Sequence, residues 1–103
     1  MTNITPQEAK AIMDTASDYR IVDVRRHDEY KEGHIPVAIC LPLDEIANEA
    51  ECELPDETQL LLIYCRSGVR SKQAAAQLEA MGYTNIKEFG GILDWPFDTE
   101  NEN

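Results

Sequence analysis

The chain has 103 residues, with 20 acidic and 9 basic side chains and a formal net charge of −11. A chain of this length buries roughly 65% of its unfolded surface, so one hydrophobic core can form without metal or disulfide cross-links. The negative charge argues against nucleic acids and anionic membranes, because both are bound through Lys and Arg. The three cysteines form no C-x-x-C pair, which argues against a zinc site and favours a reducing compartment.

No targeting or membrane segment is predicted from the sequence. The first residues carry neither the basic region nor the apolar region of a signal peptide. The longest apolar run, Leu60–Cys65, is far shorter than the roughly 20 residues that a membrane helix needs. We therefore expect a cytoplasmic protein that does not contact a membrane.

The first half of the chain predicts short helices that alternate with short strands. Thr5 and Glu8 form a capping box with Pro6 at the first helical position, so a helix should begin there. β-Branched and aromatic residues mark strands, and apolar residues at a helical period mark helices. The elements expected in chain order are a helix over residues 6–14, a strand over 19–24, a helical turn over 28–31 that stops at Gly33, a short strand over 37–41 and a helix over 43–53 with an acidic outer face.

The second half contains the most hydrophobic stretch, residues 59–65, which predicts a central strand covered on both faces. A helix over 69–81 closed by Gly82, a strand over 85–89 and a short helix reaching Trp95 should follow, and residues 97–103 predict a frayed acidic tail. Strands that alternate with helices predict an α/β fold with a mainly parallel central sheet flanked by helices on both faces. The chain shows no repeat or linker, so we expect a single domain over residues 1–103.

The segment that carries chemistry begins at Cys65, where the central strand ends and a tight turn leads into a helix. Ligands of open α/β sheets bind at the carboxyl ends of the strands, and the N–H groups at a helix N-terminus attract anions. This field, together with Arg66 and Arg70, should lower the pKa of the thiol and hold a nucleophilic thiolate. Gly68 supplies a residue that is free to adopt a positive φ.

A cysteine at a strand end is most often a small buried hydrophobic residue, and this simpler interpretation has to be weighed. Here, however, four of the nine basic residues lie at just two strand ends, which can be neighbours in a parallel sheet. These residues are Arg25, Arg26, Arg66 and Arg70. An acidic chain that gathers its basic residues in this way is expected to bind a small anion there.

Five short motifs in a fixed order resemble those of single-domain rhodaneses. The motifs are Asp23-Val24-Arg25, Glu29-Tyr30, Gly33-His34-Ile35-Pro36, the loop Cys65-Arg66-Ser67-Gly68-Val69-Arg70-Ser71, and Gly90-Gly91 before Trp95. The resemblance covers nearly the whole chain, from about Ile4 to Trp95. One departure is Val37, where the family commonly has Gly.

The resemblance implies a rhodanese-like fold and a sulfurtransferase in which Cys65 attacks the outer sulfur of thiosulfate or a related small anionic donor. Sulfite would leave, Cys65 would carry a persulfide, and a thiophilic acceptor such as cyanide or a cellular thiol would remove the sulfur. A thioredoxin-like protein is one candidate acceptor, and the chain is expected to be a monomer without metal or organic cofactor. The donor and the persulfide would be bound by Arg66, Ser67, Gly68, Val69 and Arg70, and the pair Asp23 and Arg25 would order the loop.

Three alternatives to a general sulfurtransferase are considered. Cysteine-dependent phosphatases and arsenate reductases are disfavoured, because Cys65 and Arg70 form C-x4-R, one residue shorter than the phosphatase C-x5-R, and Tyr64 stands where such enzymes commonly have His. Non-catalytic rhodanese-like modules typically lack the cysteine. A persulfide carrier that serves one protein partner stays open.

Several other residues have a simple structural interpretation beside a functional one. Asp23 and Arg25 can equally form a strand-end ion pair of little stabilising value. His34 fits a hydrogen-bonded structural role in its turn better than the role of a base for Cys65. Cys40 is expected in the core, and nothing in the spacing makes either it or Cys52 a resolving thiol.

Overall fold

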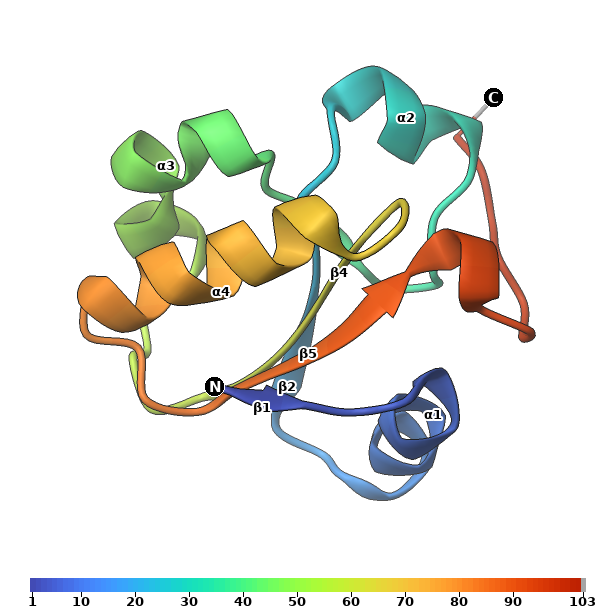
Figure 1. Ribbon diagram of the computed structural model, residues 1–103, viewed down its shortest axis with the longest axis horizontal. Coiled ribbons are helices and arrows are strands. Elements are labelled where there is room, and N and C mark those ends of the chain that lie inside the picture. Colours follow the sequence, from blue (N-terminus) through green and yellow to red (C-terminus); the bar gives the residue numbers. More distant parts are fainter. Residues whose placement is uncertain (103) are drawn as a thin grey trace.

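The central strand predicted from the apolar run lies in the middle of a five-stranded sheet in the computed structural model, which describes residues 1–102 (Figure 1). All strand pairs are parallel, and the strand order is β1-β5-β4-β2-β3. The strands are β1 (Thr2–Asn3), β2 (Tyr19–Asp23), β3 (Ile39–Cys40), β4 (Leu60–Cys65) and β5 (Ile86–Gly91). The helices are α1 (Pro6–Thr15), α2 (His27–Glu32), α3 (Ile46–Glu53) and α4 (Val69–Ala80), with 3₁₀ turns at Leu43–Glu45 and Ile92–Asp94.

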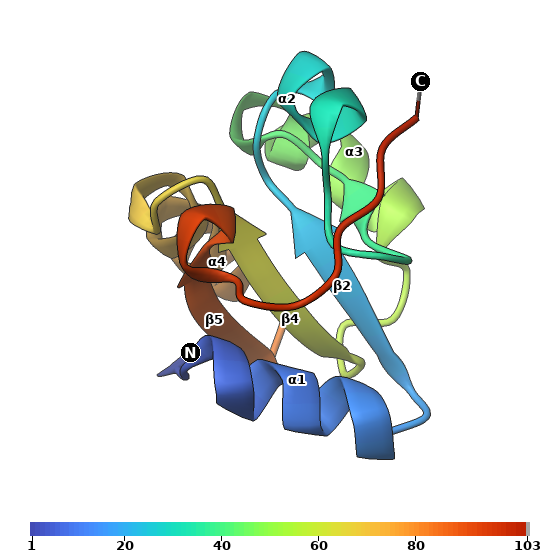
Figure 2. The ribbon, with the colours of Figure 1, turned by 90° about the vertical axis from the view of Figure 1, so that its right-hand side faces the viewer.

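Both faces of the sheet are covered, as predicted. Figures 1 and 2 show α1 on one face and α3 and α4 on the other. Side chains alternate along β4, so Leu62 and Tyr64 pack in the cluster under α1, whereas Leu61, Ile63 and Cys65 pack in the cluster under α3 and α4. Cys65 therefore ends a fully buried strand on the side where α4 begins.

Several element boundaries differ from the sequence-based prediction. The helix expected over 43–53 begins with a 3₁₀ turn after Pro42 and becomes α-helical only at Ile46. β5 continues two residues beyond the predicted end, through Gly90 and Gly91. β1 was not predicted, because two exposed residues that pair with Lys87 and Glu88 carry no periodic signal.

The acidic tail, expected to be frayed, makes backbone hydrogen bonds within the residues that the structure describes, and its fraying stays a prediction. Glu100 and His34 exchange two backbone hydrogen bonds of 2.8 and 2.9 Å, and the N–H of Glu102 donates to the carbonyl of Lys31. Figure 2 shows this last segment running from the end of β5 towards α2. Asn103 lies outside the described residues.

None of the helices within residues 1–102 is both long enough and apolar enough to span a bilayer. The cytoplasmic location stays a prediction.

The strand expected over 37–41 is reduced to two residues because the chain turns sharply before it. Val37 has a φ of 61°, which lies in the left-handed region that a β-branched residue rarely adopts. The turn is closed by the N–H of Ala38, which donates to the carbonyl of Ile35. The departure from Gly noted in the sequence thus falls on a position whose backbone favours Gly.

Replacing Val37 should therefore stabilise the protein. The side chain of Val37 is 76% exposed, so Val37→Gly loses little packing and relieves a left-handed strain of about 1 kcal/mol. Chemical denaturation should show a higher free energy of unfolding for Val37→Gly than for the wild type. Val37→Ala, which keeps a Cβ at the same φ, should gain less, and equal gains for both variants would contradict this explanation.

Candidate active site

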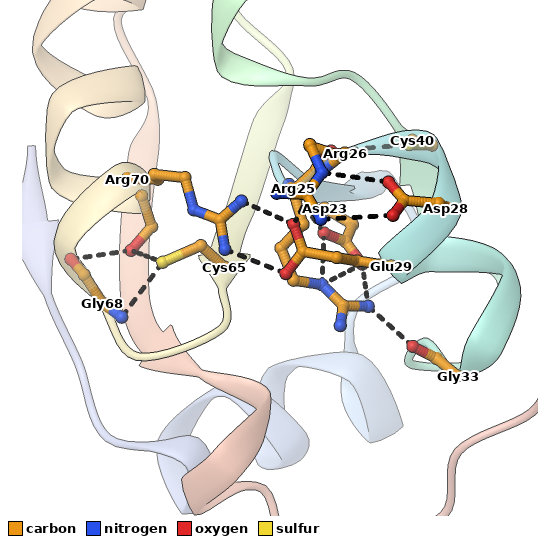
Figure 3. A network of polar contacts seen from close by, with 11 residues as sticks. Asp23, Arg25, Arg26, Asp28, Glu29, Gly33, Cys40, Cys65, Gly68 and Arg70 are labelled. Atoms are coloured by element: carbon orange, nitrogen blue, oxygen red, sulfur yellow. Dashed lines mark hydrogen bonds and ion pairs between the residues drawn. The ribbon is translucent and has the colours of Figure 1, made fainter.

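The sulfur of Cys65 lies inside a short loop that joins β4 to α4. Cys65 is 1% exposed, and the backbone N–H of Gly68 points back at its Sγ over 3.0 Å (Figure 3). Gly68 caps α4 with a φ of 105°, a conformation that favours glycine and turns its N–H inward. The hydroxyl of Ser71, in the first turn of α4, lies 3.4 Å from Sγ on the other side.

The surroundings of Cys65 favour a thiolate. Burial raises the pKa of the thiol, whereas hydrogen bonds involving the Ser71 hydroxyl and the backbone N–H groups of Ser71, Gly68 and Ser67 lower it. The hydrogen bonds outweigh burial, so the pKa of Cys65 lies below its ordinary value. A thiol with a lowered pKa at the end of a central strand is suited to act as a nucleophile.

The loop rests directly on β5. A Cβ atom at Gly91 would lie 2.0 Å from the carbonyl oxygen of Arg66, so only glycine allows this approach. The same carbonyl accepts a hydrogen bond from the N–H of Leu93. The Gly90-Gly91 motif thus supports the cysteine loop from behind.

Arg70 does not extend freely towards the sulfur. Its guanidinium forms a bidentate ion pair with Glu29 of α2, with distances of 2.6 and 3.0 Å (Figure 3). The hydrogen bonds from Arg70 lower the pKa of Glu29 to about 2 despite partial burial. Arg70 therefore ties α4 to α2, and much of its charge is balanced by Glu29.

Arg66 is the exposed cation of the loop. Among residues 1–102 its guanidinium has no ion-pair partner. It lines an open cavity of about 330 Å³ together with Arg25, Glu29, Glu32, Gly33, Ile92 and Leu93. Arg25 and Glu29 in this lining are engaged by Asp23 and Arg70, so Arg66 is the cation of the cavity whose charge is not balanced by an ion pair among the described residues. Ser67 and Val69, the remaining predicted loop residues, are exposed beside it.

Asp23 and Arg25 form a buried pair at the end of β2. Nε and Nη2 of Arg25 donate to the Asp23 carboxylate over 2.9 and 2.6 Å, and Nη2 also donates to the carbonyl of Gly33. Asp23 is fully buried and Arg25 is 5% exposed, so this is not a solvent-exposed ion pair. The hydrogen bond to Gly33 connects Arg25 to the residue that follows α2. Towards the cysteine loop, the guanidinium of Arg25 lies 5.8 Å from the centre of the Tyr64 ring.

The other residues weighed from the sequence lie away from the sulfur. The Nδ1 of His34 is 2.8 Å from the carbonyl of Tyr30, and its ring stacks on Tyr30, which fits a structural histidine. All three cysteines are free. Burial raises the pKa of the half-buried Cys40 to about 12, whereas Cys52 is exposed on α3.

Two acidic residues of the site were missed from the sequence. The sequence-based prediction contains Glu29 only as part of a motif and does not contain Glu88, although Glu88 is 0% exposed and lies 2.6 Å from the Ser71 hydroxyl. One signal was available, because Glu88 shares the inward face of its strand with Ile86. A charged residue at an inward position needs buried partners.

The comparisons with known proteins agree with this geometry. The family model of the Rhodanese-like domain matches residues 5–96. Thiosulfate sulfurtransferase PspE of Escherichia coli is 36% identical over 71% of this chain and 70% of its own length. Putative sulfur carrier protein YrkF of Bacillus subtilis is 34% identical over 94% of this chain, which spans about half (52%) of that relative. The crystal structure of a rhodanese-like domain protein from Staphylococcus aureus superposes with a TM-score of 0.85 at 31% identity, over 100% of both chains.

The protein is a five-stranded parallel α/β domain that encloses a buried cysteine in the loop between its central strand and the following helix. The chain belongs to the rhodanese-like family.

The Arg70–Glu29 pair makes stability depend on pH. Because the pKa of Glu29 is lowered to about 2 in the folded state, the pair contributes fully above the unfolded pKa of about 4.3. The contribution should be lost as the pH falls from there through about 2. Denaturant unfolding should show Glu29→Gln less stable than the wild type at pH 7, with a gap that narrows below pH 4. The exposed control Glu49→Gln should show no such narrowing, and a gap that is constant with pH would contradict the ion pair.

Proposed function

We propose that this protein is a sulfurtransferase that moves a sulfane sulfur from thiosulfate, or a related donor, through a persulfide on Cys65 to a thiophilic acceptor such as cyanide or a cellular thiol. The observation that carries the proposal is the thiol of Cys65, enclosed by the hydrogen-bond donors of its own loop. The relative named thiosulfate sulfurtransferase supports the same reaction.

The reaction follows from the chemistry of the loop. The Cys65 thiolate attacks the outer sulfur of thiosulfate, the donor S–S bond breaks, and sulfite leaves with the electron pair. The outer sulfur stays on Cys65 as a persulfide, whose negative charge can be held by the N–H groups of the loop. An acceptor thiolate or cyanide then attacks the outer sulfur and regenerates the Cys65 thiolate. No step requires a metal or an organic cofactor.

Donor binding is assigned mainly to Arg66. Its charge is free within the described residues and lines the cavity beside the loop, whereas the charge of Arg70 is engaged by Glu29. Donor binding was predicted for both arginines from the sequence, and we now propose different main roles for them. Arg66 attracts the anionic donor, and Arg70 holds the loop against α2.

The structure also bears on the phosphatase alternative. Tyr64, which stands before the cysteine, is fully buried, and its hydroxyl accepts a hydrogen bond from the N–H of Ile35. The guanidinium of Arg70 is paired with Glu29 (Figure 3). Because its charge is engaged there, Arg70 is less available to bind a phosphoryl group, which disfavours phosphate-ester chemistry.

A persulfide carrier dedicated to one protein partner is the second candidate function. The relative named putative sulfur carrier protein, aligned over 94% of this chain, favours it. The two candidates share the Cys65 persulfide and differ in the acceptor. A cytoplasmic monomer that passes sulfur to a thioredoxin-like protein is compatible with both.

Cys65→Ser should abolish sulfur transfer without unfolding the protein, because serine is nearly isosteric but does not form a persulfide. Mixing the wild type with thiosulfate should release sulfite and add the mass of one sulfur atom to Cys65. The control Cys52→Ser should keep both signals, because Cys52 is exposed on α3. Fast transfer to cyanide would identify a general enzyme, and a persulfide without turnover would identify the carrier. Sulfur transfer that survives in Cys65→Ser would refute the proposal.

Arg66→Ala should raise the KM for thiosulfate roughly tenfold with little effect on kcat, because it removes one charged contact to the donor. The matched control is Arg26→Ala, since Arg26 is exposed at the neighbouring strand end and pairs with Asp28. Steady-state kinetics at fixed ionic strength measure both variants. An unchanged KM in Arg66→Ala, or an equal rise in Arg26→Ala, would show that Arg66 does not recruit the donor.

A further inference from the structure

Ser71 stands between the catalytic sulfur and a buried carboxylate. Its Oγ lies 3.4 Å from Sγ of Cys65 and 2.6 Å from Oε2 of Glu88. Cys65 is 1% exposed, and Ser71 and Glu88 are fully buried. The three side chains therefore form a continuous hydrogen-bonded chain that is shielded from water.

Glu88 and Cys65, the two ends of this hydrogen-bonded chain, each accept further hydrogen bonds. Oε2 of Glu88 accepts from the N–H of Gly90 over 2.8 Å, and Oε1 accepts from Nδ2 of Asn3 over 2.5 Å. The nearest cation to Glu88 is Lys72, whose Nζ lies 3.7 Å from Oε1 on a side chain that is 57% exposed. The sulfur faces the N–H groups of the loop, and the arginines on its side are Arg66 and the paired Arg70. Either end can thus bear a negative charge.

The Ser71 hydroxyl has a single proton, and it can serve only one of these two anions at a time. When Glu88 is ionised, the proton of Ser71 points to Oε2, and Oγ can only accept a hydrogen bond from the thiol. When Cys65 is a thiolate, the Ser71 proton is needed at the sulfur, and Oε2 must itself be protonated to keep the contact with Oγ. The carbonyl oxygens of Gly68 and Gly90, at 3.1 and 3.3 Å from Oγ, are weaker, uncharged competitors.

We propose that Glu88 accepts the proton that Cys65 loses, through Ser71, so that the three residues share one negative charge. The S–H bond of Cys65 breaks and its proton passes to Ser71 Oγ, while the Ser71 proton passes to Oε2 of Glu88. No electron is transferred and no co-reactant is needed. Glu88 does not touch the substrate, so it is a positioning residue that sets the protonation state of the nucleophile.

The behaviour of this proton during catalysis rests on the proposed sulfur transfer. While Cys65 bears the anionic persulfide, the proton stays on Glu88. When the acceptor has removed the outer sulfur and regenerated the Cys65 thiolate, the proton returns from Glu88 through Ser71 and restores the resting thiol. The shared proton itself is a property of the resting thiol. It can therefore be tested without any sulfur donor, and a missing transferase activity would not affect that test.

The test is the ultraviolet absorbance of the thiolate as a function of pH in a Cys52→Ala background, which removes the exposed thiol. Cys40 does not interfere, because its pKa is about 12. The parent protein should form the thiolate in two steps, as expected of two coupled groups. Glu88→Gln should give one step at lower pH, with a roughly threefold larger thiolate fraction near pH 6, because the Ser71 proton is then always available to the sulfur. Ser71→Ala should give one step at higher pH.

The double variant Ser71→Ala with Glu88→Gln distinguishes proton transfer through Ser71 from simple charge repulsion. If Glu88→Gln increases the thiolate fraction as much in the Ser71→Ala background as in the parent, charge repulsion through space explains the effect, and proton transfer through Ser71 is refuted. A single titration step in the parent that superimposes on that of Glu88→Gln also refutes it.

A second measurement does not depend on the folding of any Glu88 variant. The carboxyl carbon of Glu88, followed by NMR in uniformly labelled wild-type protein, should titrate together with the thiol, and its midpoint should move in Cys65→Ala. A Glu88 titration that is identical with and without the thiol would overturn the proposal.

Discussion

The turn that carries the chain from β4 into α4 around the sulfur of Cys65 is the constraint on which the site depends. It brings the N–H of Gly68 to 3.0 Å from Sγ, and it exists only because two glycines permit it. Gly68 adopts a φ of 105°, and Gly91 leaves room for the carbonyl of Arg66 where a Cβ would clash at 2.0 Å. The central position of β4 fixes the start of this turn, because its neighbours on both sides and helices on both faces bury it.

The electrostatics of the site are local and almost independent of the net charge of −11. Two of the four arginines near the strand ends are neutralised by buried or half-buried carboxylates, Arg25 by Asp23 and Arg70 by Glu29. A thiolate on Cys65 would be stabilised at short range by the Ser71 hydroxyl and the backbone N–H groups of the loop, which surface charges screened by salt barely affect. An acidic surface is therefore compatible with an anionic substrate, provided that one exposed cation such as Arg66 stands at the entrance.

The features predicted from the sequence are those with a strong local signal. The continuous apolar run of β4, the glycine at each end of α4 and the basic residues around Cys65 are each visible within a short stretch of sequence, and together they predict the buried cysteine and its loop. The missed features depend on residues far apart in the chain. The ion pair of Arg70 was not predicted because its partner Glu29 is 41 residues away, and β1 was missed because only its pairing with β5 defines it. The predicted start of β3 was wrong for a local reason, because Val37 adopts a φ of 61° that its residue type alone does not indicate, although the family's usual Gly at this position pointed to a turn.

β5 supports the reactive loop in two ways that share a few residues. Gly91 lets the loop backbone lie against the strand, and Glu88, three residues earlier, reaches Ser71 behind the sulfur. Two adjacent buried anions would be costly in this dry environment. The Glu88 carboxylate is tolerated here because, in our proposal, only one of Glu88 and Cys65 is negatively charged at a time. Ser71 has a single hydroxyl proton, so it can donate a hydrogen bond to only one of the two anions. The same strand then fixes the shape of the loop and the protonation state of the sulfur, so the geometry and the reactivity of Cys65 are coupled through β5.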